Sequence, residues 1–138
     1  EATVLIDQIR ATAGAGLSEE DELQLLTFEA KIARFDGNDA KAFEILKKIV
    51  ERDALNGDAL IELGNYYADQ GDFDRATNRY EQAQQIARYE RPAMIAHAQA
   101  LLRNKNYDKA LILLKRAIQL KEDAYLVQYI ERIERAIQ

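Results

Sequence analysis

Residues 64–83 read GNYYADQGDFDRATNRYEQA, and this stretch decides the fold because its key positions return after 34 residues. Gly64, Tyr67, Ala76, Tyr80 and Ala83 recur as Ala98, Leu101, Ala110, Leu114 and Ala117. One step of 34 residues toward the N-terminus reaches Ala30, Ala33, Ala42, Leu46 and Ile49 with no insertion. Self-similarity at a fixed period of this size is the signature of a repeat protein. The chain is therefore predicted to contain three repeat units.

Each unit is predicted to be a pair of packed helices. Helices approach closely where side chains are small, and the three units place Ala30, Gly64 and Ala98 at one such position. In the second half of each unit, a small residue is followed four positions later by a large apolar one, which is the spacing of one helix face. These pairs are Ala42 with Leu46, Ala76 with Tyr80, and Ala110 with Leu114. The predicted fold class is all-α.

The turn inside each unit has a signature of its own. Gly37 and Gly71 suit the left-handed residue that ends a helix, and Lys105 occupies this place in the third unit. The residues that follow can cap the second helix of each unit; they are Asn38, Asp72 and Asn106. Ser18 and Asp21 resemble a capping box at the start of the first unit.

We expect one domain in which two helices flank the repeats. The units span approximately residues 18–56, 57–90 and 91–124. Residues 1–17 are expected to form a short N-terminal helix and linker that shows no register with the repeats. This helix could be a cap or the remnant of a longer array. The pattern of residues 125–138 predicts an amphipathic helix that caps the C-terminal end. A cap is expected because the last repeat unit would otherwise leave its apolar face in water. The apolar side of this helix would be formed by Leu126, Ile130, Ile133 and Ile137, with Tyr125 and Tyr129 packing in the cap.

Composition narrows the classes of partner. A hydrophobic content of 48% and a charged content of 31% indicate an ordered chain. The net charge of −5, with acidic and basic residues interspersed, argues against nucleic acid or an anionic membrane as the main partner. No apolar run approaches the ~20 residues that span a bilayer, so we expect no direct membrane insertion. The absence of cysteine leaves both reducing and oxidising compartments open.

Residues 23–124 resemble three tetratricopeptide repeats. The middle unit is closest to the family pattern, at Leu60, Leu63, Gly64, Tyr67, Ala76, Tyr80 and Ala83. The resemblance implies a right-handed α-solenoid whose leading helices line a concave groove. It also implies a non-catalytic protein–protein interaction module, an adaptor or scaffold that binds a peptide or helix of a partner protein in that groove.

Helical spacing along the leading helices predicts which residues face the groove. They are Thr27, Lys31, Arg34, Ile61, Asn65, Ile95, Gln99 and Leu102. Ile61, Ile95 and Leu102 would form an apolar strip, and the polar residues would edge it, a mixture that suits an anchor side chain and backbone hydrogen bonds. The alternative interpretation is that Ile61 and Ile95 pack between neighbouring leading helices.

No catalytic residue, metal site or cofactor is expected. The single histidine, His97, has no cysteine or second histidine as a partner, so we assign it a packing role. Two other functions stay open. The protein could be a self-associating structural scaffold that forms a homo-oligomer. It could also be the regulatory or targeting domain of a longer protein, because the sequence does not begin with methionine.

Overall fold

The computed structural model describes the backbone of residues 1–138 and every side chain except that of Ala15. The three units form helical hairpins. The first pairs α2 (Glu19–Phe35) with α3 (Asp39–Arg52), the second α4 (Gly57–Asp69) with α5 (Phe73–Gln84), and the third α6 (Glu90–Arg103) with α7 (Tyr107–Leu120). The described residues contain no strand, so the all-α prediction is confirmed.

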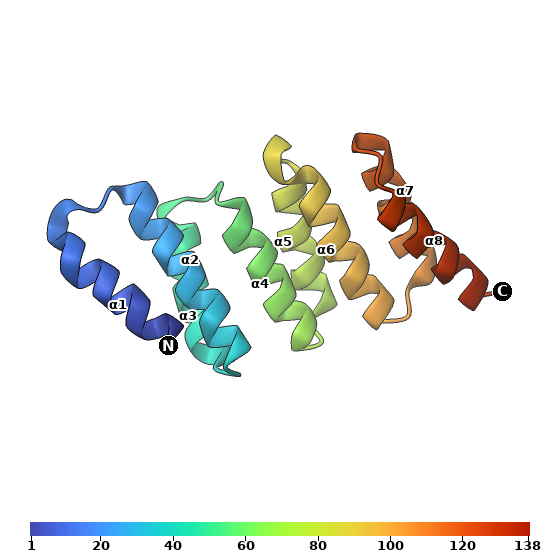
Figure 1. The fold of residues 1–138 in the computed structure, drawn as a ribbon. Coiled ribbons are helices and arrows are strands. Elements are labelled where there is room, and N and C mark those ends of the chain that lie inside the picture. Colours follow the sequence, from blue (N-terminus) through green and yellow to red (C-terminus); the bar gives the residue numbers. More distant parts are fainter.

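The hairpins stack side by side in chain order, with α1 (Ala2–Ala13) at one end and α8 (Ala124–Ala136) at the other (Figure 1). Two short 3-10 turns, η1 (Gly14–Gly16) and η2 (Ala87–Tyr89), precede α2 and α6. The termini therefore lie at opposite ends of the stack. The helical-repeat architecture is confirmed, and the handedness of its twist stays a prediction.

The turns within the hairpins have the backbone that the sequence predicts. Gly37 and Gly71 both have φ of 79°, and Lys105 has φ of 58° at the corresponding place. The side chains of Asn38 and Asp72 accept hydrogen bonds from backbone N–H groups in the first turns of α3 and α5. Asn106 also precedes its helix, but its side chain makes no capping hydrogen bond.

Gly64 explains how closely the two helices of the middle hairpin approach. A Cβ atom added to Gly64 would lie 2.6 Å from Cε1 of Tyr80, which is far inside van der Waals contact. The Tyr80 side chain is fully buried, so its ring rests directly on the backbone of α4. The predicted role of this glycine in close helix packing is consistent with that geometry.

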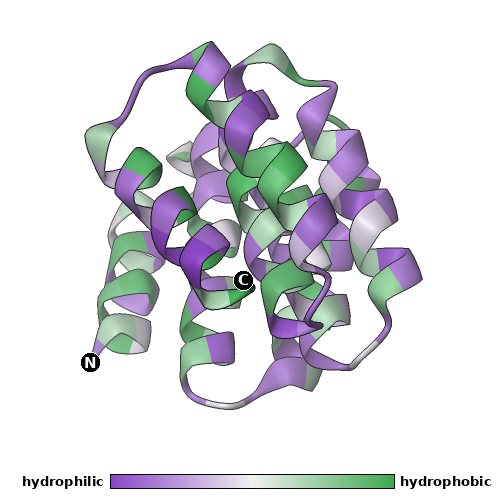
Figure 2. Cartoon of the chain, turned by 90° about the vertical axis from the view of Figure 1, so that its right-hand side faces the viewer, coloured by the Kyte–Doolittle hydropathy of each residue, from purple (hydrophilic) through white to green (hydrophobic). Residues whose placement is uncertain are grey.

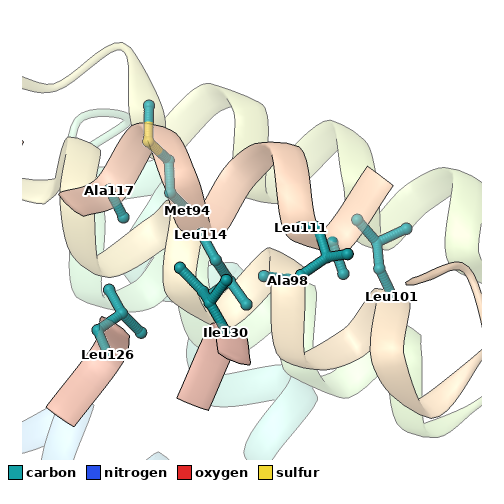
Figure 3. Close-up of a cluster of buried hydrophobic side chains, with 9 residues drawn as sticks. Met94, Ala98, Leu101, Leu111, Leu114, Ala117, Leu126 and Ile130 are labelled. Carbon is teal, nitrogen blue, oxygen red and sulfur yellow. The ribbon is translucent and has the colours of Figure 1, made fainter. Parts of the chain in front are cut away.

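The core is divided into clusters along the stack. The cluster at the C-terminal end joins α6, α7 and α8 and is drawn in Figure 3. Leu126 and Ile130 insert from α8 into this cluster beside Leu114 and Met94. Figure 2 looks onto the same end and shows hydrophobic and hydrophilic segments alternating along the helices, as expected for helices with one buried face.

The structure contradicts the sequence prediction at two residues of the cap. Ile137, expected on the apolar side, lies beyond the end of α8 and is 41% exposed, and Tyr125 is exposed as well. Tyr129 packs against the C-terminal cluster as expected, but 71% of Tyr125 is exposed. Successive residues of a helix point about 100° apart. Because Leu126 points into the core, its neighbour Tyr125 is turned toward solvent.

Candidate functional site

A trough of about 630 Å³ opens on the side of the stack formed by α2, α4, α6 and α8. We call it the trough, and it is lined by Arg34, Asn65, Gln99, Leu102, Arg103 and Tyr129. Four of these residues were predicted to face the groove, namely Arg34, Asn65, Gln99 and Leu102. Arg34 and Leu102 occupy one repeat position, and Asn65 and Gln99 occupy another, so the repeat register is what brings these residues together.

Ion pairs connect the three leading helices across the trough. Arg34 of α2 bonds to Glu62 and Asp69 of α4, at 2.6 Å in both cases. Arg103 of α6 reaches the other oxygen of Asp69 at 2.8 Å. Burial lowers the pKa of Arg34, but hydrogen bonds to the two carboxylates outweigh it and raise the pKa overall. Two cations face two carboxylates here, so the network adds no net charge to the trough.

Asn65 is held in place by Tyr80. The Tyr80 hydroxyl donates to Oδ1 of Asn65 at 2.7 Å. Burial raises the pKa of Tyr80 to about 12, so the hydroxyl keeps its proton at neutral pH and can act as this donor. Since the amide oxygen is occupied, the NH₂ group of Asn65 is the part left to donate to a ligand.

Ile61 and Ile95 do not line the trough. Ile61 is half-buried and packs against the clusters around Tyr80 and Leu60, and Ile95 packs against the C-terminal cluster. Leu102 is also half-buried against the C-terminal cluster, but it lines the trough as well. Of the three residues expected to form an apolar strip, Leu102 is the one that reaches the lining.

Thr27 and Lys31 line a different hollow, near the loop between α3 and α4. Thr27 is buried, and its hydroxyl donates to the backbone carbonyl of Leu23 at 2.9 Å. Lys31 is exposed and also borders the gap between α1 and α2. Of the eight predicted groove residues, four therefore line the trough, two line this second hollow, and Ile61 and Ile95 line neither.

Two exposed aromatic residues beside Lys31 were missed by the sequence reasoning. Phe28 is 50% exposed, and Phe35, at the end of α2, is 91% exposed. Their spacing of seven residues, which places both on one face of a helix, is the signal that could have revealed them.

His97 has the packing role that was predicted. It is buried, its ring stacks on Tyr80 with centroids 5.2 Å apart, and its two nitrogens lie within hydrogen-bond distance of Thr77 and Gln84. Burial lowers the pKa of His97, which favours the neutral ring. Among the residues with described side chains, no group of three or more His, Cys, Asp or Glu could hold a metal ion.

Over the described part of the chain, no helix is both long and apolar enough to cross a membrane.

The stacked hairpins and the polar trough define a helical-repeat protein. Residues 67–128, a little under half of the chain, match the family model described as tetratricopeptide repeat. This part of the chain is therefore similar to tetratricopeptide repeats, which are in general protein–protein interaction modules. Among curated proteins, no sequence matches this chain.

Proposed function

We propose that this protein is a non-catalytic adaptor that binds an extended segment of a partner protein in the trough. The observation that carries the proposal is the lining itself, in which amide groups stand beside apolar side chains. Gln99 is exposed and offers both a donor and an acceptor, whereas Asn65 offers its NH₂ group. An extended peptide presents both kinds of backbone group, and Leu102 and Tyr129 supply an apolar wall for one of its side chains.

The ion pairs favour a particular ligand chemistry. Recognition of a free carboxylate needs charge-assisted donors aimed at one point. Here Arg34 and Arg103 already bind Glu62 and Asp69, so a carboxylate would have to compete with two internal ones. We therefore propose an internal, uncharged stretch of a partner chain as the ligand, rather than a C-terminal carboxylate.

The test is to select peptides from a random display library on the folded protein and to measure their affinity for two variants. Gln99→Arg places a long cation in the trough, and Gln82→Arg makes the same change at an exposed glutamine of α5 as a control. We expect selected peptides to bind the Gln99→Arg variant at least about tenfold more weakly, a loss of about 1.4 kcal/mol. The control should bind them normally. Equal binding by both variants would place the site elsewhere, and a library that yields no binder would contradict the proposal.

A further inference from the structure

We propose that copies of this chain bind one another head to tail, through two surfaces that lie outside the trough. The head surface is at the N-terminal end and consists of Leu5, Ile9, Phe28 and Phe35. The tail stripe is on the outer side of α7 and consists of Lys109, Ile112, Arg116 and Leu120. The contact goes beyond partner binding in the trough and does not depend on it.

The head surface is an unusual concentration of exposed apolar side chains. On α2, Phe28 and Phe35 are 50% and 91% exposed, and on α1, Leu5 and Ile9 are 57% and 39% exposed. The two helices are in contact, because Ile6 of α1 is buried and Phe35 lines the gap between the helices. Soluble monomers rarely leave large contiguous apolar patches in water, and such patches often mark interaction sites.

The tail stripe distinguishes α7 from the other outer helices. Ile112 and Leu120 are 60% and 49% exposed. With Lys109 and Arg116 they follow spacings of three, four and four residues, so all four lie on one face of the helix. In the described part of the chain, α3 and α5 have no large hydrophobic side chain exposed in this way. The third outer helix therefore carries an apolar stripe with two cations.

Charge complementarity selects a second copy of the chain as the occupant. Residues 1–40 contain nine carboxylates and three cations, whereas residues 103–138 contain eight cations and five carboxylates. Acidic and basic residues alternate locally, but the two ends of the molecule have net charges of −6 and +3. The N-terminal end attracts a basic surface and the C-terminal end an acidic one, so each end of the chain complements the other end of a neighbour.

The side chains at the two surfaces also suit each other. Glu1, Asp36 and Lys31 border the gap that Phe35 lines, so two carboxylates and one cation lie near this aromatic ring. Arg116 is exposed and forms no ion pair within the described chain, which leaves it available to a carboxylate or to the face of Phe35. Ile112 and Leu120 can cover the remaining apolar surface. Since different surfaces meet, the contact is heterologous and extends into chains or rings.

The test is analytical ultracentrifugation of the full chain over a wide concentration range at low and high salt. Phe35→Lys disables the head and Ile112→Glu disables the tail, and both residues are exposed enough to change without loss of packing. Tyr125→Lys, at another exposed aromatic residue, is the control. We expect the weight-average mass of the native chain and of the control to rise above 15.7 kDa with concentration, and less so in high salt.

Each disabled variant should stay at 15.7 kDa when studied alone. An equimolar mixture of the two retains one intact head and one intact tail, so it should reach twice that mass and grow no further. A native chain that stays monomeric at its highest soluble concentration would overturn the proposal. So would a variant that associates like the native chain, or a mixture that stays monomeric when the native chain associates.

Discussion

Ile6 of α1 and Ile130 of α8 are equally buried, each 5% exposed, yet the helices that carry them are attached to the stack very differently. In α8, Leu126 is buried beside Ile130, and Ile133 and Tyr129 pack around them. In α1, Ile6 is the one buried residue among those described. Similar lengths of helix thus give a firm cap at one end and a loosely held helix at the other.

Helix ends increase this difference, and two ion pairs hold α8 to the stack, including Lys115 with Glu134, whereas one holds α1. The Asp123 side chain accepts hydrogen bonds from the first turn of α8 and pairs with Arg91 of α6 at 3.3 Å. No side chain caps the start of α1. The ion pair between Arg10 and Glu29 connects α1 to α2. The distribution of apolar residues around a helix, rather than their number, thus decides whether it closes the stack or leaves apolar side chains exposed.

The largest expected effect comes from removing the same side chain at the two ends. Ile130→Ala should lower the free energy of unfolding by about 3 kcal/mol, because it leaves a cavity in the C-terminal cluster. Ile6→Ala should cost less, about 1–2 kcal/mol, because α1 can shift or detach while the hairpins stay folded. Urea denaturation followed by circular dichroism measures both values. Equal losses would remove the distinction between the ends.

A change in the middle hairpin should affect both ends together. In Gly64→Ala the new methyl group would meet the buried ring of Tyr80, and relieving that overlap should cost about 1–3 kcal/mol. Gly16→Ala is the control, because no atom lies within 4 Å of a Cβ added there and its φ is not positive. Thermal unfolding of the two variants provides the comparison. An unchanged midpoint for Gly64→Ala would contradict the close packing of α4 on α5.

The smallest expected effect is a pH dependence confined to the C-terminal end. The backbone N–H of Leu126, the Arg91 side chain and the backbone N–H of Tyr125 hold the pKa of Asp123 below its ordinary value of 3.8. The stabilisation is therefore complete above about pH 3.8 and is lost as the pH falls through the lower pKa of the folded state. The cap of α2, Ser18, has no charge to lose.

Asp123→Asn keeps a capping side chain and removes the titration. Melting midpoints measured in acid should therefore fall less steeply for this variant than for the native chain. Identical acid profiles would show that Asp123 does not contribute to the acid sensitivity of the cap.

The repeats, turns and most caps could be predicted from the sequence because they follow local rules. The left-handed backbone of Gly37 and Gly71 is dictated by residue type and position. Part of the trough could also be predicted from the sequence, since Asn65 and Gln99 occupy the same position in successive units. The repeat register alone placed them side by side.

Other features depend on three-dimensional packing that spacing does not determine. The partners of Arg34 come from a neighbouring helix, so their pairing depends on how far side chains reach across the interface. Whether Ile61 packs against its neighbours or lines the trough depends on how tightly adjacent hairpins pack. Phe35 is exposed because α1 covers α2 only partly. Residues 1–17 have no register with the repeats, so the position of α1, and with it this exposure, could not be predicted from the sequence.

The most direct test of the difference between the two ends is native-state hydrogen exchange of the dilute protein, read at the backbone amides of α1 and α8. We predict that the amides of α8 exchange as slowly as those of α7, because both helices share one core cluster. Those of α1 should exchange much faster than the amides of α2. Protection of α1 equal to or greater than that of α8 would contradict the account of a capped end and an open one.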